Sequence, residues 1–284
     1  MKKVISGVFL ALILIFTSST TYAAGKDIQI KVDGFAIASD VKPEIKNNHI
    51  MVPLRVISEN LGAKLHGSNS EITLTKNNMQ VTLKLNSSTA VINGKTVRLD
   101  VKPYIKNNRT FVPLRFISET FGCTVNYKNS IVTVDTEPLV IDGIKVKALQ
   151  EEYHMFMGGV VQQINVNAYN EAIYKTIVEN KGNKVEAPAN YSWNMNLDTP
   201  GAYYKNAQFN FLDQKGNSIK RFDIYSLSGS FPAEILAGYP KVLMYDDTEK
   251  QWYLFSDNAS QSIYHIIDTA SKNGLLTIIS NTVA

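Results

Sequence analysis

The chain contains one long internal repeat. Residues 40–75 recur without a gap as residues 100–135, and 19 of the 36 aligned positions are identical. Seven of the other 17 positions exchange one apolar residue for another. Two units this alike usually pack against each other around a shared core. We therefore expect one pseudo-symmetric domain, because a unit of about 50 residues has only a marginal core of its own.

Each copy is predicted to form a β-β-α-β-β unit. Asp33-Gly34 and Asn93-Gly94 favour tight hairpin turns, because these residues readily adopt left-handed backbone angles. The segments 42–48 and 102–108 read as extended pieces that end in a second turn. Each carries a proline, which keeps it out of a central strand.

A short helix follows the Val-Pro-Leu-Arg motif of each copy. The prolines are predicted in the first helical turn, where the missing N–H costs nothing, and the glycines end the helix in the left-handed conformation. The arginine and the glutamate four residues later could hold an anion or form an intrahelical ion pair, and we favour the ion pair. The positions interpreted as structural are Pro53, Arg55, Glu59, Gly62, Pro113, Arg115, Glu119 and Gly122.

The paired turns and the helix motif, which occurs twice, resemble the copper amine oxidase N-terminal-like domain. This stalk module occurs repeatedly in secreted and surface proteins of Gram-positive bacteria, and the resemblance covers roughly residues 28–136. The family often has Asn-Gly-Arg where this chain has Asn47-Asn48-His49 and Asn107-Asn108-Arg109, and it commonly has a tryptophan after the helix. Asparagine tolerates positive φ, so the turns are expected to survive.

The resemblance concerns the stalk and not the catalytic domain of an amine oxidase. That domain needs three copper-binding histidines, two of them as His-x-His, and a tyrosine between asparagine and an acidic residue. Here His49, His66, His154 and His265 are far apart in sequence, and neither Tyr127 nor Tyr191 precedes an acid. We expect no catalytic residue, no metal and no cofactor.

The N-terminus has the pattern of a signal peptide over residues 1–23. Lys2 and Lys3 precede an apolar run that ends near Phe16, and Thr21-Tyr22-Ala23 is a small-x-small cleavage site. The apolar run is too short to span a bilayer stably. The sequence thus predicts a secreted or envelope-associated protein with no membrane span after removal of the signal.

The roughly 260 remaining residues (284 − 23 = 261) suit two domains, a stalk at 26–138 and a separate α+β domain at 139–284. The net charge of +4 includes two lysines of the signal peptide, and the remaining bias is too small for a nucleic-acid partner. The single cysteine, Cys123, replaces Ala63 of the first copy, which indicates a buried small residue.

The second half carries no family motif that we identify. Its patterns predict antiparallel hairpins over 208–225 and 241–256, helices over about 167–180 and 259–271, and a polar loop over 181–200. Asp246-Asp247 is interpreted as a hairpin turn.

Aromatic residues are frequent in this half, and most are expected to alternate into the core. Those near the polar loop are the exception, because the loop has neither helical nor strand periodicity. The predicted binding residues are Tyr191, Trp193, Tyr203 and Tyr204.

The leading hypothesis is an exported, non-enzymatic binding or scaffold protein. Its stalk would present the C-terminal domain to a cell-wall polymer or an extracellular protein. The alternative is a secreted hydrolase that acts on cell-wall material through the C-terminal half.

Overall fold

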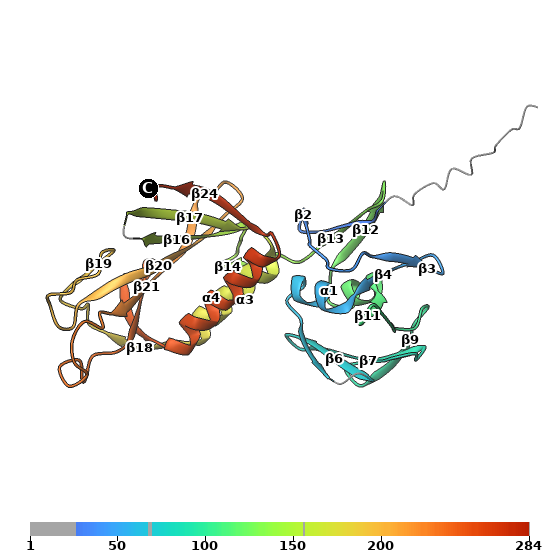
Figure 1. Ribbon diagram of the computed structural model, residues 1–284, viewed down its shortest axis with the longest axis horizontal. Coiled ribbons are helices and arrows are strands. Elements are labelled where there is room, and N and C mark those ends of the chain that lie inside the picture. Colours follow the sequence, from blue (N-terminus) through green and yellow to red (C-terminus); the bar gives the residue numbers. More distant parts are fainter. Residues whose placement is uncertain (1–26, 68–69, 156, 284) are drawn as a thin grey trace, which may run out of the picture.

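The computed structural model describes residues 27–67, 70–155 and 157–283. The predicted signal peptide lies outside these residues. The described chain is an α+β fold of four helices and mainly antiparallel strands. Figure 1 shows two lobes, with the N-terminal half in blue to green and the C-terminal half in yellow to red.

Three small sheets and two helices make up the N-terminal lobe. The sheets have the orders β12-β13-β1-β2, β10-β11-β4-β3 and β5-β6-β7-β8-β9. The elements are β1 (Gln29–Val32), β2 (Phe35–Ala36), β3 (Glu44–Lys46), β4 (His49–Pro53), α1 (Leu54–Asn60), β5 (Lys64–Gly67), β6 (Glu71–Lys76), β7 (Met79–Lys84), β8 (Thr89–Ile92), β9 (Lys95–Arg98), β10 (Tyr104–Lys106), β11 (Arg109–Pro113), α2 (Leu114–Thr120), β12 (Thr124–Lys128) and β13 (Ile131–Asp135).

Residues 44–60 and 104–120 form the same three elements, a hairpin followed by a helix. The inner strands β4 and β11 pair antiparallel with Val52 opposite Val112, and both valines belong to one buried cluster that also contains residues of α1 and α2. Reciprocal ion pairs add to this contact, because Asp40 binds Arg109 while Asp100 lies 3.3 Å from His49. The two segments therefore share one core.

The asparagine turns form as expected. Both central residues have positive φ in each, at 49° and 62° for Asn47 and Asn48 and at 49° and 57° for Asn107 and Asn108. This geometry matches the twist of the flanking strands. The strands that follow the prolines, β3 and β10, lie at the two edges of their sheet.

Two details of the predicted β-β-α-β-β unit are wrong. Two hairpins precede each helix, because the asparagine turns close strands of their own. Pro53 and Pro113 end β4 and β11 and cap the helices instead of standing in the first turn, since their ψ angles of 122° and 117° are extended. Gly62 and Gly122 follow the helices with φ of 73° and 78°, as predicted.

The C-terminal lobe is a large sheet covered by two helices on one face. Its strands run in the order β18-β23-β22-β21-β20-β16-β17-β24, with β19 beside β20, and a separate hairpin β14-β15 precedes it. The elements are β14 (Val140–Ile141), β15 (Ile144–Lys145), β16 (Ala148–Met155), β17 (Gly158–Ile164), α3 (Asn167–Glu179), β18 (Lys181–Val185), β19 (Tyr191–Ser192), β20 (Tyr203–Leu212), β21 (Ser218–Leu227), β22 (Val242–Asp246), β23 (Gln251–Phe255), α4 (Asp257–Lys272) and β24 (Leu276–Asn281).

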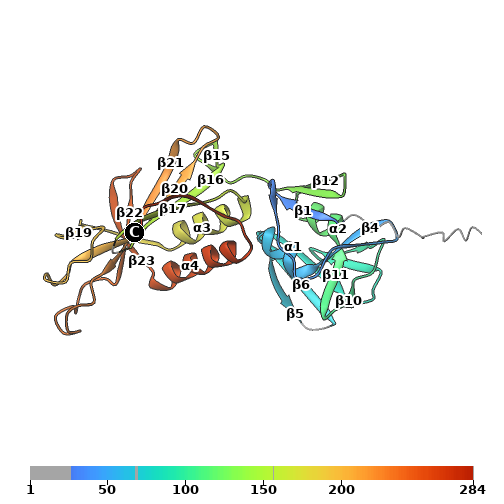
Figure 2. The ribbon, with the colours of Figure 1, turned by 45° about the horizontal axis from the view of Figure 1, so that its top comes forward.

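Helices α3 and α4 lie side by side between the sheet and the N-terminal lobe (Figures 1 and 2). They bury the predicted apolar stripes, which include Ile173, Ile177, Ile263 and Ile267. Both predicted hairpins are present. The sequence patterns missed β16 and β17, and the expected loop over 181–200 begins with the edge strand β18.

One aspartate of the N-terminal lobe caps a helix of the C-terminal lobe. The residue that precedes α3, Val166, offers no side-chain cap. Instead, Asp33 Oδ2 accepts the backbone N–H of Asn167 at 2.9 Å, and its Oδ1 accepts the N–H of Thr136 at 2.8 Å. A carboxylate at a helix N-terminus satisfies a free donor and opposes the helix dipole. This contact fixes the start of α3 to the first turn of the N-terminal lobe.

The remaining contacts between the lobes are close and partly polar. Asn77 donates to Glu171 of α3 at 3.2 Å, and Lys76 lies 3.9 Å from the same carboxylate. A Cβ on Gly62 would lie 3.2 Å from the Ala168 methyl carbon, so α1 ends close against α3. The main buried cluster accordingly includes residues of both lobes.

Two single observations complete the fold. Cys123 is buried, as expected, and burial raises the pKa of its thiol to about 11. No helix within the described ranges is long and apolar enough to cross a membrane.

Candidate functional site

The face of the large sheet that α3 and α4 leave uncovered carries an aromatic cluster. Side chains alternate along a strand, so Phe222 and Ile224 face the helices while Tyr225 faces the other way. Tyr225 packs there with Tyr203, Leu243 and Trp252. We call this surface, with the residues described below, the aromatic face.

Tyr191 of β19 is a fixed and accessible ring on this face. Its side chain is 49% exposed, yet the ring meets Trp252 edge-on at 4.8 Å and Tyr225 at 5.8 Å. The ring of Tyr245 also contacts Trp252, with 5.2 Å between the ring centres. An aromatic ring held by its neighbours loses little conformational freedom on binding.

A charge network lies beside the rings. Asp223 is only 2% exposed in its side chain and accepts from Lys205 Nζ at 2.7 Å and from Arg221 Nε at 3.1 Å. Arg221 also reaches Asp247 at 3.2 Å, and Asp247 accepts from Lys250 at 2.9 Å. Burial, followed by the charge of Asp223, raises the pKa of Tyr225 above its usual range. Asp223 and Asp247 thus each accept from two neighbouring cations, an arrangement that suits fixed hydrogen bonding.

These groups line a hollow of about 560 Å³ on the aromatic face, bounded on one side by residues 185–187. In Figures 1 and 2, β19 lies at the end of the C-terminal lobe farthest from the N-terminal lobe. The hollow therefore opens away from the contact between the lobes.

Trp193 stands at the margin of this face. Its ring stacks on His154 at 3.9 Å with the planes 7° apart, and Lys205 Nζ lies 4.5 Å from its centre. A Cβ on Gly159 would come within 2.8 Å of the His154 ring, so this stack requires glycine behind it. The imidazole in turn hydrogen-bonds Glu152 at 3.0 Å.

The four aromatic residues predicted from the sequence have different environments. Tyr191 is exposed and Trp193 is half-buried, but Tyr203 is only 3% exposed and donates its hydroxyl to the Pro240 carbonyl at 2.7 Å. Tyr203 was therefore wrongly expected at the surface, because it belongs to a regular strand that pairs with β21. Tyr204 is half-buried and, as its neighbour in that strand, points to the opposite face.

The sequence-based prediction missed the partners of Tyr191. Trp252, Tyr225 and Tyr245 are among the aromatic residues expected in the core, where Tyr225 and Trp252 do lie buried, and none of the charged residues around Asp223 is among the predicted site residues. A usable signal was present, because Arg221, Asp223 and Tyr225 alternate with Phe222 and Ile224 along one strand. A strand with apolar residues on one face and paired charges on the other marks a sheet with only one face under helices.

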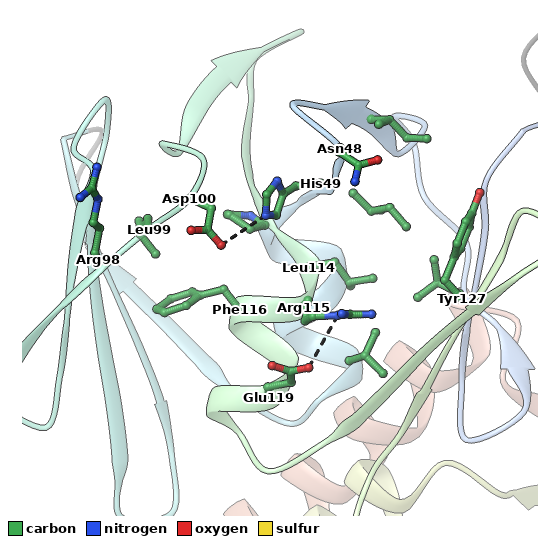
Figure 3. A pocket seen from close by; sticks show the side chains of 15 residues that line it. Asn48, His49, Arg98, Leu99, Asp100, Leu114, Arg115, Phe116, Glu119 and Tyr127 are labelled. Atoms are coloured by element: carbon green, nitrogen blue, oxygen red, sulfur yellow. Dashed lines mark hydrogen bonds and ion pairs between the residues drawn. The ribbon is translucent and has the colours of Figure 1, made fainter.

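A second hollow of about 600 Å³ lies in the N-terminal lobe, over α2 and beside the β3–β4 hairpin (Figure 3). Apolar residues such as Leu114 form its floor, and Tyr127 stands at one side. Two pairs of polar side chains lie in it, His49 with Asp100 and Arg115 with Glu119 at 3.6 Å, and Arg98 also lines it. The aspartate pair recurs as Asp40 with Arg109, which indicates a structural role.

The repeated helix residues form the ion pairs that we favoured. Arg55 lies 4.0 Å from Glu59 and Arg115 lies 3.6 Å from Glu119, all four at the surface. Exposed pairs of this kind contribute only about 0.3–0.5 kcal/mol. Partial burial of the Glu59 carboxyl raises its pKa. The two ion pairs explain the repeated arginine and glutamate without a bound anion.

A third hollow, of about 1100 Å³, lies between the lobes and is lined by α3, α4 and the end of α1. Its Lys76 and Glu171 belong to the contact already described. Within the described residues, no three histidine, cysteine, aspartate or glutamate side chains gather in a way that could hold a metal ion.

One carboxyl group, that of Glu151, has a strongly raised pKa. Burial raises the pKa of Glu151 to about 7, against the smaller opposing effect of a hydrogen bond from Gln162. Glu151 is only 5% exposed and lies on the helix-covered side of the sheet, in line with Leu149. It does not reach the aromatic face.

The N-terminal lobe matches a known family. Residues 31–136 match the family model described as the copper amine oxidase N-terminal domain. This span is 106 of 284 residues (136 − 31 + 1 = 106), less than half of the chain, and the domain is not the catalytic one. No curated protein matches the chain.

Proposed function

We propose that the chain is an exported, non-enzymatic binding protein of a Gram-positive bacterium. A duplicated stalk module at the N-terminus would present the C-terminal domain to a partner in the cell envelope or outside the cell. The aromatic face is the binding surface in this proposal, and Tyr191 is its main contact residue.

The observation that carries the proposal is the environment of Tyr191. A half-exposed ring, held edge-on by two buried aromatic neighbours and bordered by fixed charges, has the features of a binding hot spot. Its place at the far end of the C-terminal lobe suits a domain presented by a stalk. The Asp33 cap on α3 would let the stalk hold that domain in one orientation.

No specific observation favours the alternative of a hydrolase acting on cell-wall material. Asp223 and Asp247 of the aromatic face are held by lysine and arginine, and Glu151, with the raised pKa, is buried on the other side. A general acid must reach its substrate within hydrogen-bond distance.

The test is capture of partners by the immobilised mature chain, residues 24–284, from wall, membrane and secreted fractions of a Gram-positive bacterium. The Tyr191→Ala chain should lose the captured material. Tyr127→Ala is the matched control, because Tyr127 is also 49% exposed but lies in the other lobe. Equal capture by Tyr191→Ala and the unmodified chain would overturn the proposal.

A further inference from the structure

The charges around the aromatic face balance. Its hollow is lined by three cations and three anions, namely Lys205, Arg221, Lys250, Glu186, Asp223 and Asp247. Asp223 and Asp247 are already neutralised by the cations beside them. Complementary charge is what attracts an ionic ligand, and this site has no net charge to offer. A strongly anionic wall polymer is thus a poor match, and an uncharged ligand is favoured.

The backbone beneath the face is fully used by the sheet. Strands β21, β22 and β23 each have a paired strand on both sides. A peptide that adds to a sheet needs an unpaired edge, and the free edge next to the hollow belongs to β18, not to the strands that carry the rings. A ligand that lies on β21, β22 and β23 must therefore be recognised by their side chains.

The dimensions of the hollow suit a small or chain-like ligand. Its volume of about 560 Å³ falls within the range of roughly 300–1,000 Å³ seen for small-ligand sites. Stable protein partners instead cover about 800 Å² of each surface.

The ligand must therefore combine an apolar face with uncharged polar edges. The face of a tyrosine ring is electron-rich and attracts weakly positive C–H groups, while Arg221 and Asp247 supply a fixed donor and a fixed acceptor nearby. A pyranose ring has this pattern, with C–H groups on its faces and hydroxyl groups around its edge.

We propose that the aromatic face binds an uncharged oligosaccharide, with one sugar ring stacked on Tyr191 and its hydroxyl groups bonded by the Arg221–Asp247 pair. The inference rests on the proposed function and adds the chemical class of the partner to it. The glycan chains of a cell envelope are one source of such a ligand, and soluble oligosaccharides carry the same chemistry.

The chain contains its own reporters for this site. Its two tryptophans are Trp193, at the margin of the face, and Trp252, directly beneath Tyr191. A sugar ring placed on Tyr191 should change the emission of Trp252. The experiment titrates the mature chain with N-acetylglucosamine and glucose oligomers of several lengths and follows tryptophan fluorescence at low and high salt.

We expect saturable binding that salt leaves unchanged, because screening affects only charged ligands. Tyr191→Ala should weaken it at least about tenfold, as expected for a hot-spot residue, while Tyr191→Phe retains it. Tyr127→Ala should bind like the unmodified chain.

Two outcomes would overturn the inference. One is the absence of any saturable fluorescence change with all neutral oligomers while the same chain captures a protein through Tyr191; the proposed function then stands with a protein partner. The other is binding of an anionic polymer, poly(glycerol phosphate), that weakens steeply with salt. If the unmodified chain neither binds the oligomers nor captures a partner, the proposed function itself is overturned.

Discussion

Tyr191 and Tyr127 are equally exposed but have different surroundings. Both side chains are 49% exposed, and both follow an asparagine in the sequence. Tyr191 differs because Trp252 and Tyr225 hold its ring from below. Preorganisation of this kind lowers the entropy cost of binding, and it depends on residues up to 61 positions away (252 − 191 = 61).

Glu151 gives a prediction about pH at the same scale. Burial raises its pKa from the ordinary 4.5 to about 7 in the folded chain. Between these pH values the folded state keeps a proton that the unfolded state has lost, so stability falls as pH rises. The loss of unfolding free energy is absent below pH 4.5 and reaches roughly 3 kcal/mol above pH 7.

Glu151→Gln should remove this penalty, because the amide cannot ionise and its oxygen can still accept from Gln162. We expect the variant to gain stability over the unmodified chain at pH 8 but not at pH 4.5, measured by urea unfolding. Glu137→Gln, at an exposed glutamate, is the control. A gain that is the same at both pH values would show that Glu151 is not protonated in the folded chain.

At the scale of elements, the asparagine turns and the contact of α3 with the first turn differ in how far apart their residues lie in the sequence. The turns are local, since two neighbouring residues with positive φ determine each of them. The cap on α3 is not local, because Asp33 and Asn167 are 134 residues apart. An isolated α3 would therefore begin without a side-chain cap.

Asp33→Ala tests that contact. Asp142→Ala is its matched control, because both aspartates stand before glycine in hairpin turns, with φ of 50° and 49°. Both variants lose the turn preference, but only Asp33→Ala also loses the helix cap. We expect Asp33→Ala to cost about 1–2 kcal/mol more in unfolding free energy. Equal costs in a denaturant titration would mean that the cap does not hold the lobes.

The elements that could be predicted are those with local signals. The Asn-Asn and Asp-Gly turns, the stripes of α3 and α4 and the glycines after α1 and α2 are all decided within a few residues. Strands β16 and β17 were missed, because Glu151 and Gln162 place polar residues on the buried face of the sheet. Of the rings on the aromatic face, the sequence singles out Tyr191, Trp193 and Tyr203, since the others come from strands whose pairing no short segment specifies.

At the scale of the molecule, the N-terminal lobe has its halves interlocked. Strand β1 pairs parallel with β13, and β4 pairs with β11, so each half completes a sheet of the other. The C-terminal lobe joins this unit through α3 and a continuous buried cluster. Strand β19, which carries Tyr191, lies at the far end of the C-terminal lobe (Figure 1).

A fragment of residues 27–86 should not fold. It would lack β11 and β13, the partners of β4 and β1, and would expose the core residues that face them. Residues 27–138 retain both pairs and should unfold cooperatively. Circular dichroism melts of the two fragments check this, and a cooperative transition in the shorter one would contradict a shared core.

The central claim is that the molecule meets its partner through the aromatic face. Site-specific photocrosslinking tests it most directly, with benzoylphenylalanine placed at position 191 in one chain and at position 127 in another. Both chains are incubated with intact Gram-positive cells and irradiated. We predict covalent adducts from position 191 and none from position 127. Adducts from position 127 alone would contradict the account and place binding in the N-terminal lobe.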